Sequence, residues 1–183
     1  MKELALHILD IVQNSITADA KRINLKIAES IKDDELTIVV EDDGFGMDEE
    51  MLMKVTDPFV TSRTTRKVGL GIPLLKQAAE ECEGSLRIHS EVNSGTTIKA
   101  TFQHSHIDRV PLGDIPETIC TILLYGRDFD LLYEHLTDQG QFKFDTAEIR
   151  QVLQETPLTH PDVIVWIRES LTEELRSIAA TTT

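Results

Sequence analysis

LTIVVEDDGFGM, residues 36–47, begins as a strand and ends as a turn. Leu36, Ile38 and Val40 alternate, as in a strand with one buried face. The last six residues carry two carboxylates and two glycines, and glycine permits left-handed backbone and the close approach of a ligand. Asp42 stands where the strand ends, a frequent position for site residues. Such a turn is structural about as often as functional, so its role depends on the rest of the chain.

The residues around this stretch predict a regular order of helices and strands. Their apolar residues recur at helical spacing in some segments and alternate in others, and Gly84 is a plausible helix end. We predict a helix (3–18), two strands (22–28 and 35–42), a short helix (48–55), a loop (57–68), a helix (69–84) and a hairpin (85–92 and 95–102). This order is typical of an α+β, two-layer α/β sandwich, which we expect over residues 1–103.

The remaining residues predict a smaller α+β unit. Residues 104–117 are rich in polar residues and proline and predict a linker. Within residues 118–178 we expect a strand at 118–125, a hairpin around TDQG (137–140), and two helices. Asp145 with Glu148 is a capping pattern for the first of these helices, and Pro161 suits the start of the second.

The composition is that of a globular protein. Hydrophobic residues make up 40% and charged residues 27% of 183 residues. The longest apolar run, ICTILLY (119–125), is far shorter than the roughly 20 residues that span a bilayer, so we expect no membrane association. Cys82 and Cys120 show no metal-ligand spacing, which favours reduced thiols and a cytoplasmic location.

The net charge of −14 argues against a nucleic-acid-binding surface, which needs clustered Lys and Arg. Residues 54–76 are the exception. They carry five basic residues against Asp57 alone, a local charge of five minus one, or +4. A small phosphorylated ligand suits such a segment better than a duplex does.

A polar stripe crosses the otherwise apolar first helix. His7, Asp10, Asn14 and Thr17 are spaced by three, four and three residues and therefore share a helix face. A solvated face is one interpretation, although such faces usually consist of Lys and Glu. The other is that Asn14, with a carboxylate one turn earlier, orders a hydrated Mg²⁺, which takes few protein ligands.

Two further segments offer groups for an anion. Residues 57–71, DPFVTSRTTRKVGLG, combine hydroxyls with Arg63, Arg66 and Lys67, and their last glycines open a helix whose N-terminal amides can receive phosphate. The turn SGTT (94–97) alone is most simply a hairpin turn.

Taken in order, these motifs resemble the boxes of the GHKL ATP-binding superfamily. DIVQNSITADA, DDGFGM, DPF, and GLGIPLLKQAAEECEGSLRIHSEVNSGTTI resemble its N, G1, F and G2 boxes and its closing Gly-Thr motif, over about residues 5–103. The superfamily includes histidine kinases, MutL-type repair proteins, type II topoisomerases and ninety-kilodalton chaperones. From DPF (57–59) to GLG (69–71), the predicted lid region, the chain is most similar to histidine kinases, and the first helix is nearer the MutL type. We therefore expect the Bergerat fold, without phospho-acceptor helices before it.

The resemblance implies ATP and Mg²⁺ as ligands and assigns residues to them. Asp42 would accept a hydrogen bond from the adenine amino group, which agrees with the acceptor-only chemistry of a carboxylate. Asn14 would bind the Mg²⁺. The implied nucleotide-binding set is Asn14, Asp42, Gly44, Gly46, Met47, Phe59, Thr61, Arg63, Arg66, Lys67, Gly69, Leu70, Gly71 and Thr96.

Two positions depart from the family pattern. Hydrolytic members have a general-base Glu where this chain has Asp10, and many histidine kinases have Asn there. Asp10, the candidate catalytic residue, is a methylene shorter than Glu. The G2 pattern often begins with a glycine where this chain has Lys67, which adds a charge near the γ-phosphate.

Four other residues are interpreted as structural. His104 and His106 lack a third metal ligand. His89 suits a strand surface, and Trp166, with Val163, Ile167 and Leu171, suits the buried face of the final helix. His7 is expected near the nucleotide and not as a phospho-acceptor.

Two functions remain open from the sequence. The first is a kinase-type module that transfers the ATP γ-phosphoryl group to a protein partner in trans. The second is an ATP-hydrolysing or ATP-sensing switch that regulates a partner. A DNA-repair role of the MutL type is disfavoured by the net charge.

Overall fold

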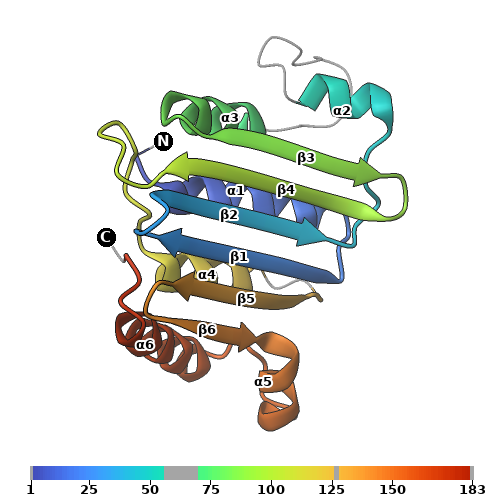
Figure 1. The fold of residues 1–183 in the computed structure, drawn as a ribbon. Helices are drawn as coiled ribbons and strands as arrows, with labels where there is room; N and C mark the ends of the chain where they lie inside the picture. The colour runs from blue at the N-terminus through green and yellow to red at the C-terminus, as the bar shows by residue number, and fades with distance from the viewer. Residues whose placement is uncertain (1, 56–69, 126–127, 182–183) are drawn as a thin grey trace.

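The computed structural model describes residues 2–55, 70–125 and 128–181. These residues form one sheet and a set of helices (Figure 1). The helices are α1 (Leu4–Thr17), α2 (Glu49–Val55), α3 (Gly71–Glu81), α4 (Ile115–Leu123), α5 (Thr146–Leu153) and α6 (Pro161–Ser177). The strands are β1 (Arg22–Ser30), β2 (Glu35–Asp42), β3 (Ser85–Glu91), β4 (Gly95–Gln103), β5 (Asp130–Thr137) and β6 (Gly140–Asp145).

The six strands lie in the order β3-β4-β2-β1-β5-β6. All neighbours are antiparallel except β1 and β5, which run parallel. Helices α1, α3 and α4 lie behind the sheet in Figure 1, on the same face. The α+β class and the two-layer architecture predicted from the sequence are therefore confirmed.

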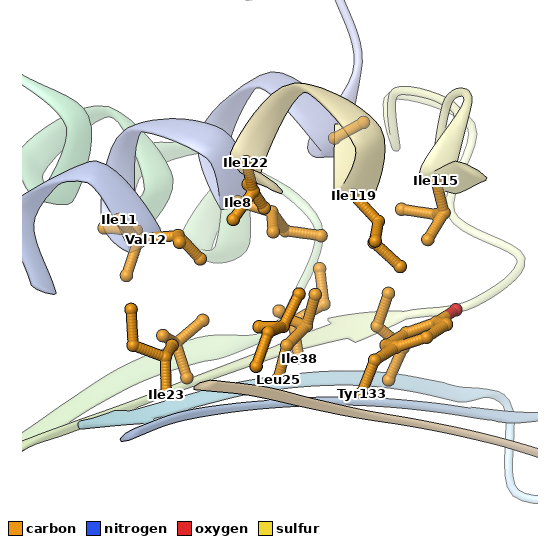
Figure 2. Close-up of a cluster of buried hydrophobic side chains, with 14 of the residues drawn as sticks. Ile8, Ile11, Val12, Ile23, Leu25, Ile38, Ile115, Ile119, Ile122 and Tyr133 are labelled. Carbon is orange, nitrogen blue, oxygen red and sulfur yellow. The ribbon is translucent and has the colours of Figure 1, made fainter. Parts of the chain in front are cut away.

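The core lies between the helix layer and one face of the sheet. Figure 2 shows isoleucines of α1 and α4 above Ile23, Leu25, Ile38 and Tyr133 of the sheet. In β1, Ile23, Leu25 and Ile27 are buried and the residues between them are more exposed, as the alternation predicts. Burial of these side chains, each worth about 1.5–3 kcal/mol, fixes which face of the sheet the helices cover.

The strand predicted at 118–125 is wrong, because the segment forms helix α4. Asp114 caps this helix by accepting a hydrogen bond from the backbone N–H of Glu117 at 2.9 Å, and Pro116 suits its first turn. The helix also begins inside the predicted linker. Since α4 contacts α1 and α6, most of its residues are buried, and Ile115, Ile119 and Ile122 recur at helical spacing on its buried side.

The other C-terminal elements were predicted correctly. Residues TDQG join β5 to β6, Asp145 caps α5 through the N–H of Ala147 at 2.9 Å, and α6 begins at Pro161. Strand β5 extends the sheet of the first hundred residues by pairing with β1 from Arg22 to Glu29. The sheet is thus continuous across the predicted linker, and a division into separately folding units stays a prediction.

The prediction that Trp166 is buried is wrong. Its exposed fraction is 53%. Helix α6 buries a face centred on Val163, Ile167 and Leu171, and Trp166 is rotated about 100° from Ile167 around the helix. The predicted surface position of His89 is confirmed. Both cysteines are unpaired and buried.

The described residues bear on two kinds of feature: a metal-binding cluster and a membrane-spanning helix. Within the described ranges, no three His, Cys, Asp or Glu side chains are grouped as a metal centre would require. No helix of the described residues has the length and apolar character to cross a membrane.

Candidate functional site

Asp42 lies at the end of β2 with its side chain on the helix-covered face, and it is 9% exposed. The hydroxyl of Ser15 on α1 donates to its Oδ2 at 2.6 Å, and the backbone N–H of Gly44 donates to its Oδ1 at 3.0 Å. A carboxylate can accept about four hydrogen bonds. Asp42 is therefore a positioned acceptor with capacity left for a further donor.

The neighbouring Asp43 has a different task. Its Oδ1 accepts the backbone N–H groups of Lys21 at 2.7 Å and of Arg22 at 2.9 Å. These two bonds tie the turn after β2 to the start of β1. The pair of acids in DDGFGM thus divides into Asp42, which keeps acceptor capacity, and Asp43, which holds the turn.

Gly44 and Gly46 are required by close contacts of the backbone. A Cβ at Gly44 would lie 2.7 Å from the carbonyl oxygen of Ala18, just beyond α1. Gly46 has φ +64°, and its Cβ would lie 1.9 Å from the carbonyl oxygen of Glu91. The turn therefore lies flat between the end of α1 and the β3–β4 hairpin, where no side chain fits.

The hairpin turn SGTT (94–97) contacts the DDGFGM turn (42–47). Thr96 is the cross-strand partner of Asp42, and Gly95 has φ +95° against the carbonyl of Asp42. The Ser90 hydroxyl lies 2.8 Å from the Thr96 hydroxyl and accepts the N–H of Met47 at 2.8 Å. The structure therefore brings Thr96 to the turn that contains Asp42 and Met47, which lies in a distant part of the chain.

Asp10 and Asn14 form a second polar pair, one turn apart on α1. Both are half-buried, and neither side chain has a hydrogen-bond partner among the described residues. Burial raises the pKa of the Asp10 carboxyl above its ordinary value. Asp10 and Ser15 are about 7.5 Å apart along the axis of α1. The Asp10–Asn14 pair therefore lies at a different position along α1 from the contact between Ser15 and Asp42.

Gly71 begins α3 directly against Asp10. A Cβ at Gly71 would lie 2.9 Å from the Cβ of Asp10. The cap position, Leu70, offers no side-chain hydrogen bond, so the first N–H groups of α3 have no side-chain cap at a position where the helix dipole is positive. The structure thus sets a helix N-terminus beside the carboxylate of Asp10, one turn before Asn14 on α1.

Six of the predicted nucleotide ligands cannot be placed relative to Asp10, Asp42 and Gly71. Phe59, Thr61, Arg63, Arg66, Lys67 and Gly69 lie outside the described residues. His7 is buried within α1, and burial lowers its pKa to about 4. It is consequently a neutral core histidine at neutral pH, not an exposed group of the stripe.

Ser15 and Ser90 were not singled out by the sequence. Ser15 is on the buried face of α1, where its hydroxyl also lies 3.4 Å from the carbonyl of Ile11. The sequence signal for Ser15 was a small hydroxyl residue among the apolar positions of the first helix. Its target, Asp42, is 27 residues away and becomes evident only in the folded chain.

The comparison with protein families covers this site. Residues 2–106 match the model of the histidine kinase-, DNA gyrase B-, and HSP90-like ATPases. The chain belongs to this ATPase family. Its residues 2–106 therefore form an ATP-binding domain of the histidine-kinase-like type, as the motifs implied, and the predicted GHKL membership is confirmed.

Known proteins resemble this ATPase domain over part of their length. The signal transduction histidine-protein kinase ArlS of Staphylococcus aureus (strain USA300) is 31% identical over 96 residues, which are 50% of this chain and 21% of that kinase. The crystal structure of the N-terminal domain of a DNA repair protein superposes with a TM-score of 0.52 and 14% identity, over 79% of this chain and 52% of that one. The latter likeness concerns the fold alone. This ATPase-family chain spans about a fifth of the kinase's length.

Proposed function

We propose that this protein binds Mg²⁺–ATP between α1, the DDGFGM turn and α3, and transfers the γ-phosphoryl group to a protein partner in trans. The observation that carries the proposal is Asp42, a buried carboxylate oriented by Ser15 and Gly44 that keeps free acceptor capacity. An adenine amino group is a donor that matches it, whereas the keto oxygen of guanine would be repelled.

The phosphate end of the proposed site is the region of Asp10, Asn14 and Gly71. Asn14 supplies an amide oxygen, a ligand type that Mg²⁺ accepts, and its side chain has no competing partner among the described residues. The N-terminal amides of α3 suit the phosphate charge. A bound Mg²⁺ would neutralise part of that charge during transfer.

The basic residues of the predicted lid complete the proposal. Arg63, Arg66 and Lys67 would neutralise the γ-phosphate, and the partner would supply the accepting group. Similarity to ArlS over the ATPase region supports a kinase-type reaction. The proposed location is the cytoplasm, which the two unpaired cysteines favour.

Asp10 favours a second candidate, an ATPase switch. Its half-buried carboxyl has a raised pKa and lies against Gly71 at the phosphate end. A carboxylate whose pKa is shifted toward neutral pH is a better proton acceptor for an attacking water. In that case hydrolysis itself would change the contacts between the protein and its partner.

One experiment separates these functions. The γ-phosphate of Mg²⁺–ATP is followed over hours with wild type, Asp10→Asn, and Asp42→Ala as the non-binding control. Phosphate release by wild type and not by Asp10→Asn would identify Asp10 as a base and the protein as a hydrolytic switch. ATP that is bound and left intact by both would support the kinase awaiting its acceptor, and equal ATP binding by Asp42→Ala would contradict the site itself.

A further inference from the structure

The second face of the sheet carries an ordered row of charges. No described helix crosses this face, which is turned to the viewer in Figure 1. At the middle register of the sheet, each outward-facing residue lies directly opposite the next across all six strands. From β3 to β6 they are Arg87, Lys99, Val39, Lys26, Glu134 and Lys143. We call Arg87, Lys99, Lys26 and Lys143 the basic row.

The basic row is unusual in so acidic a protein. Four cations against Glu134 give the register a charge of four minus one, or +3, within a chain of −14. All four cations are exposed. The neighbouring register on the side of Ser85 and Thr101 contains no charged residue from β3 to β6, whereas the register on the other side contains Glu41 and Asp145.

Internal stability accounts for only part of the row, because Lys26 and Lys143 lie directly opposite Glu134 but Arg87 and Lys99 face each other. Arg87 lies directly opposite Lys99, and like charges in that arrangement destabilise a strand pair. Arg87, Lys99 and Lys26 form no ion pair with any residue that the structure describes, and Lys143 alone approaches an acid, Glu148, at 3.6 Å. A negatively charged group from another molecule could therefore offset the repulsion between Arg87 and Lys99.

The chemistry of the face narrows the class of partner. Nucleic acids are disfavoured, because the outward-facing positions of the six strands hold no Phe, Tyr or Trp on which bases could stack. A membrane surface is disfavoured by the net charge of −14 and because none of the exposed large apolar residues belongs to these strands.

An acidic polypeptide fits both the charge and the spacing. Neighbouring strands lie about 4.8 Å apart, so the row extends over roughly 24 Å. A helix rises about 5.4 Å per turn, so acids one turn apart on one helix face can approach successive strands. We propose that the open face of the sheet is a docking surface for an acidic helical segment of a partner protein, bound through the basic row.

The docking surface is independent of the nucleotide site. Asp42 and α1 lie on the opposite, helix-covered face of the sheet. Loss of ATP binding therefore leaves the docking proposal intact, and Asp42→Ala should bind the acidic segment like wild type. Likewise, failure of the acidic peptide to bind would not contradict the proposed ATP site.

The test is the affinity for a fluorescein-labelled, 20-residue Glu/Ala helical peptide, measured by fluorescence anisotropy at low salt. The variant Lys26→Gln/Arg87→Gln/Lys99→Gln is compared with Lys2→Gln/Lys32→Gln/Arg176→Gln, which removes the same charge from exposed cations elsewhere. We expect a loss of about tenfold or more for the first and less than about twofold for the second, with binding weakened by salt. The first variant should melt close to wild type, because it removes both the repulsion between Arg87 and Lys99 and the attraction between Lys26 and Glu134.

Several results would overturn the proposal. They are no peptide binding by wild type, equal losses in the two variants, or tighter binding of single-stranded dT20 or of phosphatidylserine vesicles through the same residues. Sedimentation of the protein alone is the remaining check. Self-association that the first variant abolishes would assign this face to a second copy of the chain.

Discussion

Two buried carboxylates at opposite ends of the β1–β2 pair have contrasting surroundings. Asp42 pairs with the start of β1, at Ile23, whereas Glu29 lies near the end of β1, opposite Leu36. Both side chains are on the helix-covered face and are less than a tenth exposed. Asp42 accepts bonds from Ser15 and Gly44 and retains acceptor capacity, while Glu29 is enclosed by partners from distant parts of the chain.

The partners of Glu29 connect three segments. Its Oε1 lies 2.7 Å from Nε2 of His135 on β5 and accepts the backbone N–H of Thr181 at 2.9 Å. His135 is in turn hydrogen-bonded to the hydroxyl of Tyr133, and His104 lies 3.5 Å from the second oxygen of Glu29. Burial opposes ionisation of Glu29, but the bonds from His135 and Thr181 outweigh it and lower its pKa to about 2. One buried acid therefore serves stability and the other is available to a ligand.

The largest expected effect is on Glu29. Glu29→Ala should lower the free energy of unfolding by about 2–6 kcal/mol, because it leaves the ring nitrogen of His135 and the N–H of Thr181 without their partner, at about 1–3 kcal/mol each. Urea denaturation followed by circular dichroism measures this. Glu35→Ala on the exposed start of β2 is the control and should change stability by less than about 0.5 kcal/mol. A similar small effect at Glu29 would show that its network contributes nothing to the fold.

The next effect is on ATP affinity at the other acid. Asp42→Ala should weaken ATP binding by about 1.5–3 kcal/mol, a loss of roughly 10- to 150-fold, as expected for a charge-assisted hydrogen bond. Isothermal titration calorimetry measures it. Asp43→Ala is the matched control in the same turn, because its bonds go to the backbone of β1. It should cost more in stability than in affinity, and the reverse order would exchange the roles of the two acids.

A third effect, the dependence of stability on pH, separates Glu29 from His7. The folded-state pKa of Glu29, about 2, is below its ordinary value of 4.5, so its stabilisation is present above pH 4.5 and is lost as the pH falls toward 2. His7, at about 4 instead of 6.5, remains neutral in the fold while the unfolded chain takes up a proton, so stability also falls from pH 6.5 to 4. Urea midpoints from pH 7 to 3 should lose the upper decline in His7→Leu and the lower one in Glu29→Gln. An unchanged upper decline in His7→Leu would mean that another group causes it.

The sequence predicted those parts of the fold that rest on local patterns. The alternation in β1 and β2 and the cap at Asp145 depend on residues a few positions apart, and each was predicted correctly. The strand expected at 118–125 was wrong because the apolar run ICTILLY was interpreted without Ile115 and the Asp114 cap before it, which give the segment its helical spacing and its start. Trp166 was misplaced because one step around a helix separates buried from exposed positions.

The candidate site divides in the same way. The sequence by itself determined the family and the motif that contains Asp42, Gly44 and Gly46. This was possible because the motif, a glycine turn directly after a strand, consists of consecutive residues. Only the tertiary structure decided that Ser15 orients Asp42, that Asp10 lies against Gly71, and that β5 joins the sheet beside β1. Those contacts join residues far apart in the chain, and burial in a shared core, not local propensity, selects them.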